Sequence, residues 1–427
     1  MDITFTVRAL YQQADKMTIP VINAIINFST GAGFASPMIL DSGVIGVNAF
    51  ADTTAVTVDV SNLVDSIKTN RGRTASSDVF QTGTLSLRII DQTGAFNPLN
   101  PLSPYYSLLT PMRKVTITAT YGSNTYPIFA GYITSYSTTT PKDVGEVVYT
   151  TISAVDGFRL ANNAQITTVS GATAGQTTGT RIGKILDTIG WPTGMRDIDA
   201  GQTTVASDPG TLRNGLAAMQ TIESTEYGAL YIDAFGNFVF QDRRLTSSSV
   251  AGTPVVFNDN GTGIAYNNAL WKLDDSLVFN RASVTRVGGT AQVASNQASI
   301  DKYFLHSYQE QNLMMETDAE ALNNAQAFCA SRAETSIRCD AVVLDLYTNN
   351  YNSGILAALG LDFFDPITVS TTQPGSSVLT KTLQVFGISH DIRPSAWKTT
   401  LTTLEPILDS FIIGTNYGIL GTNILSY

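Results

Sequence analysis

Short stretches in which apolar and polar residues alternate constrain the fold of this chain more than any other feature. Residues 84–89 read Thr-Leu-Ser-Leu-Arg-Ile, and residues 115–120 read Val-Thr-Ile-Thr-Ala-Thr. A period of two places the apolar side chains on one face of a β-strand and the polar ones on the other. Residues 128–136 and 147–154 are further candidates. The pattern predicts a sheet with one face on a core and the other open to water or to a neighbouring chain.

Between two such β-rich stretches the apolar period lengthens to that of a helix. The apolar residues of 182–189 predict a helix with Thr180 as its N-cap, and a second helix is predicted from about 208 to 228. Residues 229–240 then predict a hairpin. Farther on, Thr317-Asp318-Ala319-Glu320 predicts a capping box that opens another helix. Later strands are predicted at residues 283–287, 341–347, 366–370, 380–388 and 399–404.

Charge is scarce in this sequence. Of its 427 residues 43% are hydrophobic and only 14% are charged, and 25 Lys and Arg against 35 Asp and Glu give a net charge of −10. Disorder is excluded because disordered chains combine low hydrophobicity with high charge. Recognition of nucleic acid through a basic face is disfavoured, since phosphates need clustered Lys and Arg. Abundant Thr, Ser, Asn and Gln indicate a large polar β-protein with much of its surface covered by other chains.

Cellular context follows from the N-terminus, the hydropathy and the cysteines. Residues 1–8 have no basic region ahead of an apolar stretch, so no signal peptide is predicted. No apolar run approaches the ~18 residues of a membrane span. Cys329 and Cys339 lie too far apart for a redox pair or a zinc knuckle, and we predict both as buried small side chains. These features indicate synthesis in a reducing cytoplasm.

Motifs for catalysis or cofactor binding are weak. His390 has no nucleophile elbow beside it, and His306 has no zinc-type partner, so both are interpreted as structural or surface residues. Residues 179–185 differ from a phosphate-binding loop in their glycine spacing and lack the Ser or Thr after the Lys. Residues 259–263 lack the closing Glu of a calcium loop, and we predict a turn there.

Two pairs of acids, Glu223 with Glu226 and Asp274 with Asp275, have the composition of a glycosidase pair. Sequence does not give their separation, and solvated surface acids are the default interpretation. We therefore predict no catalytic residue, no cofactor and no metal ligand.

A short similarity links the two ends of the chain. Residues 43–48, Gly-Val-Ile-Gly-Val-Asn, match residues 418–423, Gly-Ile-Leu-Gly-Thr-Asn, 375 positions later. Chance is one interpretation in a glycine-rich chain, and a pair of docking arms is the other. The predicted partner-docking residues are Gly43, Val44, Ile45, Gly46 and Asn48 in the first arm and Gly418, Ile419, Leu420, Gly421 and Asn423 in the second.

Five stretches with turn and strand motifs follow one another between Val56 and Pro406. They are Val58 to Arg73 with its Arg-Gly-Arg end, the loop from Asp91 to Ser103-Pro104-Tyr105, Phe129 to Ile133, Glu226 to Arg243, and His390 with Trp397 to Leu401. In this order they resemble the tail-hub proteins of long-tailed phages, often labelled minor tail proteins. One departure is Tyr303-Phe304, where the family tends to have Tyr-Gly.

The resemblance implies a mainly β (α+β) fold with two β-barrel-like hub domains, a small α/β unit between them and extended terminal arms. It also implies a homotrimer at the tail tip of a virion, assembled in the host cytoplasm. Two barrels in three chains give six modules, which suit the hexameric tail tube or distal-tail ring. The opposite face would meet a trimeric tip, spike or fibre protein, and the tape-measure protein is a further expected partner. DNA would pass through the channel without being held.

Two other functions are alternatives to the hub. One is a tail-associated enzyme that cuts host wall or glycan; such an enzyme would need a fused hydrolase domain, and we expect none beyond the C-terminal docking arm. The other is a receptor-binding fibre or adhesin, for which the expected repeats are missing.

The predicted organisation has five parts. They are an N-terminal docking arm (1–50), predicted to be irregular, a first β-barrel (51–165), an α/β helix–hairpin domain (166–260), a second β-barrel with an inserted helix (261–408) and a C-terminal docking arm (409–427).

Overall fold

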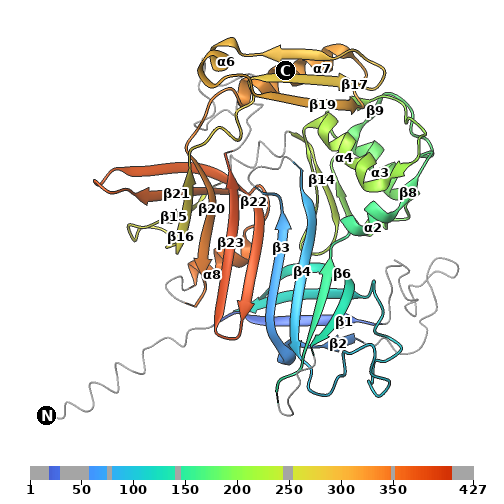
Figure 1. Ribbon diagram of the computed structural model, residues 1–427, viewed down its shortest axis with the longest axis vertical. Helices are drawn as coiled ribbons and strands as arrows, with labels where there is room; N and C mark the ends of the chain where they lie inside the picture. Colours follow the sequence, from blue (N-terminus) through green and yellow to red (C-terminus); the bar gives the residue numbers. More distant parts are fainter. Residues whose placement is uncertain are drawn as a thin grey trace.

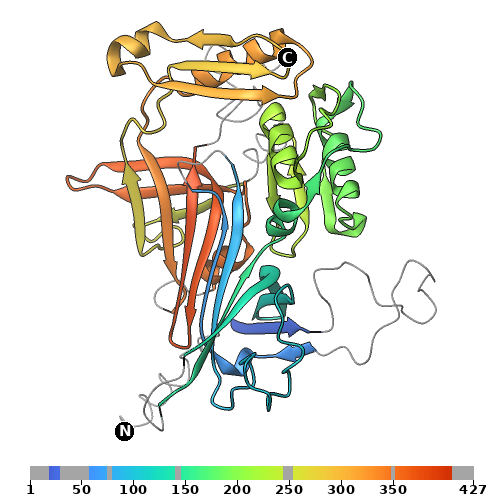
Figure 2. The same cartoon turned by 45° about the vertical axis from the view of Figure 1, so that its right-hand side comes forward.

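A computed structural model describes residues 19–28, 57–74, 79–139, 146–243, 253–347 and 352–405, and the structural statements below concern these residues. The largest element is one large twisted sheet, with a small α/β unit beside it and a third, sheet-and-helix unit at one end (Figures 1 and 2). The fold is therefore mainly β with some helices, as predicted.

The large sheet contains 13 strands that come from both ends of the described chain. Its main path runs β16-β20-β23-β22-β3-β4-β7-β6-β5-β1-β2, and β21 joins it through β22 and carries β15. The strands are β1 (Val21–Asn27), β2 (Thr57–Asp59), β3 (Val64–Gly72), β4 (Gln81–Ile90), β5 (Lys114–Tyr121), β6 (Asn124–Thr139), β7 (Tyr149–Val155), β15 (Val255–Asn258), β16 (Asn268–Lys272), β20 (Arg338–Asp345), β21 (Pro366–Thr372), β22 (Val378–Arg393) and β23 (Ala396–Leu404).

The sheet consists of two modules with the same connectivity. In the first module the pairing order is β3-β4-β7-β6-β5-β1, and in the second it is β16-β20-β23-β22-β21-β15. Corresponding strands follow each other in the same chain order. Both modules contain one strand of 16 residues, β6 or β22, that pairs with a hairpin partner over its first half and with a different strand over its second half. The two modules differ at one edge, because β1 is antiparallel to β5 whereas β15 is parallel to β21.

The register of the pairs repeats as well. Lys114 of β5 lies opposite Tyr132 of β6, as Pro366 of β21 lies opposite Gln384 of β22. Directly after these pairs, both long strands have a bulge against the strand on their other side, after Ile133 in β6 and after Val385 in β22. A β-bulge bends its strand and increases the local twist. The match in bulge position therefore extends the duplication from topology to local geometry.

The modules lie side by side in one sheet because β3 of the first pairs with β22 of the second. All steps from β16 to β3 are antiparallel, so β3 and β16, which correspond, point the same way. The two modules therefore have the same orientation in the sheet, and one follows the other along it. The two predicted barrels are not closed: among the described strands the main path keeps two open ends, and the modules share one sheet.

The α/β unit follows the first module in the chain and has its own three-stranded sheet, β10-β14-β13. The predicted hairpin is confirmed as β13 and β14, with Gly236 at φ +92° in the turn. Two predicted helix starts are wrong: the N-cap of α3 is Thr177 rather than Thr180, and α4 begins only at Gly215. The elements are α2 (Phe158–Asn163), β8 (Gln165–Ile166), β9 (Gln176–Thr177), α3 (Thr178–Thr188), β10 (Arg196–Ile198), β11 (Thr204–Val205), β12 (Arg213–Asn214), α4 (Gly215–Glu226), β13 (Ala229–Ile232) and β14 (Phe238–Gln241).

The third unit is inserted between β16 and β20 and has a small core of its own. The predicted capping box is confirmed, since the Thr317 hydroxyl accepts a hydrogen bond from the Glu320 N–H and the Glu320 carboxylate accepts one from the Thr317 N–H. Cys329 and Cys339 are both buried free thiols, as predicted. The elements are β17 (Arg281–Arg286), β18 (Gln292–Ser295), α6 (Gln297–Tyr303), β19 (Ser307–Leu313) and α7 (Asp318–Ser331); α8 (Ser353–Gly360) lies later, between β20 and β21.

The expectation of irregular chain over residues 1–50 is wrong for β1. Val21–Asn27 pairs with β5 along its whole length, and Ala24 and Ile26 are completely buried. The strand was missed because its residues, Val-Ile-Asn-Ala-Ile-Ile-Asn, do not alternate cleanly between apolar and polar.

Candidate docking site

The two modules meet in a closely packed junction between β3 and β22. Gly72 lies where β3 meets β22, at φ +103°, and a Cβ there would lie 2.3 Å from the Phe386 carbonyl oxygen. The two arginines beside it are held by aromatic rings: the Arg71 guanidinium lies 5.0 Å from the Phe363 ring, and that of Arg73 lies 4.0 Å from the Phe386 ring. The Arg-Gly-Arg sequence therefore serves to bring two strands of different modules into close contact.

His390 also belongs to this junction, opposite Thr69 of β3. Trp397 Nε1 donates a hydrogen bond to His390 Nδ1 at 3.2 Å, and the same nitrogen forms a hydrogen bond with the Thr399 hydroxyl at 3.0 Å. Complete burial, and after it the nearby Arg71, lower the pKa of His390 to about 3, so the imidazole is neutral at physiological pH. His306, the second histidine, pairs through Nε2 with the Tyr303 carbonyl. The interpretation of both as structural residues fits these contacts.

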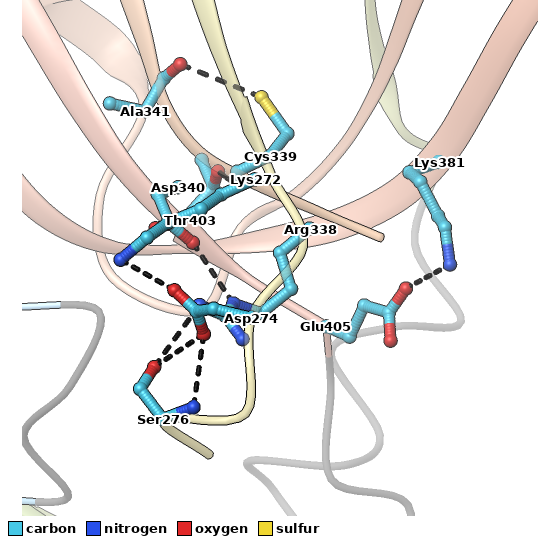
Figure 3. Close-up of polar contacts among 10 residues, drawn as sticks. All are labelled: Lys272, Asp274, Ser276, Arg338, Cys339, Asp340, Ala341, Lys381, Thr403 and Glu405. Carbon is cyan, nitrogen blue, oxygen red and sulfur yellow. Dashed lines mark hydrogen bonds and ion pairs between the residues drawn. The ribbon is translucent and has the colours of Figure 1, made fainter. Parts of the chain in front are cut away.

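One open edge of the sheet is β16, which pairs only with β20 among the described strands. Its end is fixed by charge: Asp274 accepts from Lys272 Nζ at 2.6 Å and from Arg338 Nη2 at 2.9 Å, with the Ser276 hydroxyl at 2.6 Å (Figure 3). These hydrogen bonds lower the pKa of the Asp274 carboxyl, and the bond from Lys272 has the largest effect. Asp274 is therefore an ion-paired residue, while Asp275 is largely exposed, with 67% of its side chain accessible.

A further open edge lies within the sheet: among the described strands, the second half of β6, Ser135–Thr139, pairs only with β7. The corresponding half of β22 pairs with β23 on one side and with β3 on the other. An unpaired strand edge offers a row of N–H and C=O groups to another chain. The second half of β22 in the second module thus has a partner on its outer side, β3, whereas no described strand takes that place beside β6 in the first module.

A second exposed feature is the loop between β4 and β5, in which three turns follow each other as Asn97-Pro98-Leu99, Asn100-Pro101-Leu102 and Ser103-Pro104-Tyr105. In each, the first side-chain oxygen accepts the N–H two residues on, at 3.0 to 3.1 Å, and the first carbonyl accepts the N–H three residues on. Proline fixes φ at the second position. The loop is therefore rigid, yet Leu99 and Leu102 are 86% and 90% exposed.

One row of side chains across the sheet is polar, and its charges balance. Directly opposite residues on neighbouring strands share a face, so the register defines rows across both modules. One such row contains three serines, two lysines and two aspartates, and Lys68 Nζ lies 3.8 Å from Asp391 Oδ2. The row runs Ser135, Ser153, Ser86, Lys68, Asp391, Lys398 and Asp345.

The prediction that Glu223 and Glu226 are solvated surface acids is wrong. Both lie on α4 and are 4% and 0% exposed. Glu226 accepts the N–H groups of Gln202 and Thr203 at 3.0 and 2.8 Å, and Glu223 accepts the Leu230 N–H at 2.8 Å. Burial raises the pKa of Glu223 to about 8. These carboxyls connect α4 to neighbouring loops, and their burial depends on segments far away in the sequence.

The ten predicted docking residues of the terminal arms, within 43–48 and 418–423, lie outside the described residues. Within the described ranges, no three His, Cys, Asp or Glu side chains gather in a way that could hold a metal ion. Among the described helices, none combines the length and the apolar character that a membrane crossing requires.

No protein-family model matches the sequence, and no curated protein is significantly similar to it. Solved structures do match. The 43 kDa tail protein of prophage MuSo2 from Shewanella oneidensis superimposes with a TM-score of 0.50 at 13% identity, over 83% of this chain and 96% of that one. A tail protein from Neisseria meningitidis superimposes with a TM-score of 0.52 at 10% identity, over 82% and 93%. This chain has the fold of a phage tail protein.

The likeness extends over most of the chain, since each match covers more than four fifths of it. Sequence analysis predicted the mainly β tail-protein fold, but the two barrels that it predicted are not closed among the described strands, and it missed two features of the sheet and its loops. The twin modules are recognisable only from strand pairing. The exposed leucines could have been found from the tandem Asn-Pro-Leu triplets, because each triplet encodes one turn with an apolar residue at the same position.

Proposed function

We propose that this chain is a structural hub of a phage tail, three copies of which form a ring. The duplicated module carries the proposal. Within one chain, β3 of the first module pairs with β22 of the second. The same step, applied once more, sets β16 of a second copy against the open edge of β6 at Ser135–Thr139. Each added copy leaves the same two edges, so pairing continues until the ring closes.

Six modules complete the ring when three chains take part. A six-fold arrangement of similar modules fits a hexameric tail tube or distal-tail ring on one face. Three-fold features, such as the single inserted third unit of each chain, suit a trimeric tip, spike or fibre protein on the other face. The chain would thus act as a symmetry adaptor at the tail tip of the virion, assembled in the host cytoplasm and in contact with the tape-measure protein.

We also propose that the face of the sheet that carries the polar row of side chains lines a channel for DNA. Tight binding to DNA requires cations that neutralise phosphates. In the row described above, Lys68 and Lys398 alternate with Asp391 and Asp345, so the charges balance. Serine hydroxyls make up the rest of that row. Such a wall lets a polyanion slide past without holding it.

The terminal arms supply a test of partner docking. In this proposal the two arms of three chains make six contacts to a six-fold ring. We expect Asp in place of Val44, Ile45, Ile419 and Leu420 to abolish capture of the tail-tube or distal-tail ring protein in a pull-down, because apolar contacts would be replaced by buried charge. The variant should still assemble into the three-chain hub. Capture at the wild-type level would eliminate the arms as docking elements.

The location of the protein in the virion distinguishes the hub from the two alternatives, a tail-associated wall- or glycan-degrading enzyme and a receptor-binding tail protein. We expect gold-labelled antibodies against the purified chain to mark the tail tip of intact phage particles. Label along fibres would favour receptor binding. Label at the tip together with glycan cleavage by the purified chain would favour the enzyme.

A further inference from the structure

The turn loop between β4 and β5 and helix α8 occupy corresponding places in the two modules. The loop joins β4 to β5, and α8 joins β20 to β21. Inside the chain, α8 contacts the β5–β6 hairpin of the other module. Tyr121 donates a hydrogen bond to Asn352 at 3.4 Å, and a Cβ on Gly360 would lie 4.0 Å from the Tyr126 ring. The β20–β21 connection of the second module therefore packs on the hairpin of the module beside it.

The corresponding contact of the first module has no partner within the described chain. Its connection, the turn loop, would have to pack on a β21–β22 hairpin that lies beyond the open edge of β6. Register identifies the point of contact. Ala119 lies opposite Tyr126 in the first module, and Thr371 lies opposite Leu379 in the second, so Leu379 takes the place of Tyr126.

The chemistry of the two surfaces agrees with such a contact. Leu99 and Leu102 are 86% and 90% exposed on a loop that consecutive turns hold rigid. On the hairpin, Val378 is 59% exposed and Leu379 is half-buried. Apolar side chains gain about 25 cal/mol for each Å² removed from water, and a rigid loop loses little conformational entropy on binding.

We propose that the Leu99–Leu102 loop of one copy docks on the β21–β22 hairpin of the next copy. This contact lies beside the β16–β6 strand pairing and adds an apolar clamp to it. The proposal rests on the three-chain ring of the proposed function, and it adds the residues that hold neighbouring chains together.

The first test is loss of assembly. We expect the double substitution Leu99→Asp with Leu102→Asp to weaken association at least tenfold, measured by light scattering over a dilution series. Leu212→Asp is the matched control, because Leu212 is 67% exposed but lies in the α/β unit. Circular dichroism of both variants should equal that of the wild type. Unchanged association of the double variant would refute the docking contact.

The second test locates the contact. Leu102→Cys combined with Val378→Cys, oxidised with copper phenanthroline, should give covalently linked dimers and trimers on a non-reducing gel. Leu102→Cys combined with Val293→Cys, at an exposed position of β18, should not. Equal or absent linking in the two pairs refutes the contact while the ring stands. A wild-type chain that is monomeric refutes the ring itself.

Discussion

Gly72→Ala is expected to lower the apparent melting temperature by on the order of 5 °C or more and to reduce the yield of folded protein. A side chain at φ +103° is strained, and its Cβ would lie 2.3 Å from the Phe386 carbonyl oxygen and 2.5 Å from Gly387 Cα. Both atoms belong to the backbone of β22, so the two modules would have to separate. We expect a cost of about 3 kcal/mol, from strain together with overpacking.

Gly122→Ala is the matched control for this experiment. Gly122 also has positive φ, at +60°, but nothing lies within 4 Å of a Cβ built there. Its substitution should therefore cost only about 1 kcal/mol from backbone strain. Thermal unfolding followed by differential scanning fluorimetry compares the two. Equal losses in both variants would show that the close contact at the module junction does not matter.

Glu223→Gln is expected to change how stability depends on pH. Burial raises the pKa of Glu223 from 4.5 to about 8, against the opposing effects of the Leu230 N–H and Arg73. The folded state then keeps a proton that the unfolded state releases above pH 4.5. The contribution of this group is therefore fully present below pH 4.5 and is lost as pH rises towards 8, by on the order of 4 kcal/mol. Glutamine has no such proton to lose.

The measurement is the difference in melting temperature between variant and wild type at several pH values. The melting temperature of the variant minus that of the wild type should rise steadily between pH 5 and pH 8. Asp156, whose pKa is raised to about 7, and His390, whose pKa is lowered to about 3, act equally in both proteins and cancel in the difference. The exposed Glu146→Gln serves as the control and should give a flat difference. A flat difference for Glu223→Gln would contradict its burial as a neutral acid.

Local features of this fold were predictable, because the residues that determine them are neighbours in the chain. The alternation in 84–89 gave β4, and Thr317 with Glu320 gave the capping box of α7. Start positions of helices were less accurate. Several Thr and Asn residues near α3 and α4 are each able to cap a helix, and the tertiary contacts select among them.

Features that depend on distant segments were not predictable. Glu226 is buried by Gln202 and Thr203, which no periodicity links to it. The duplicated modules share pairing and bulges, but their side chains differ: Ser86 of β4 corresponds to Ala341 of β20. The partner-docking residues of the arms remain a prediction.

The number of chains in the assembly tests the central claim most directly. Size-exclusion chromatography with multi-angle light scattering on the purified full chain measures its mass without reference to shape. The three-chain ring predicts a single species at three times the chain mass of 45.7 kDa. A monomer, or a dimer, at every concentration would contradict the ring and with it the proposed role as a hub.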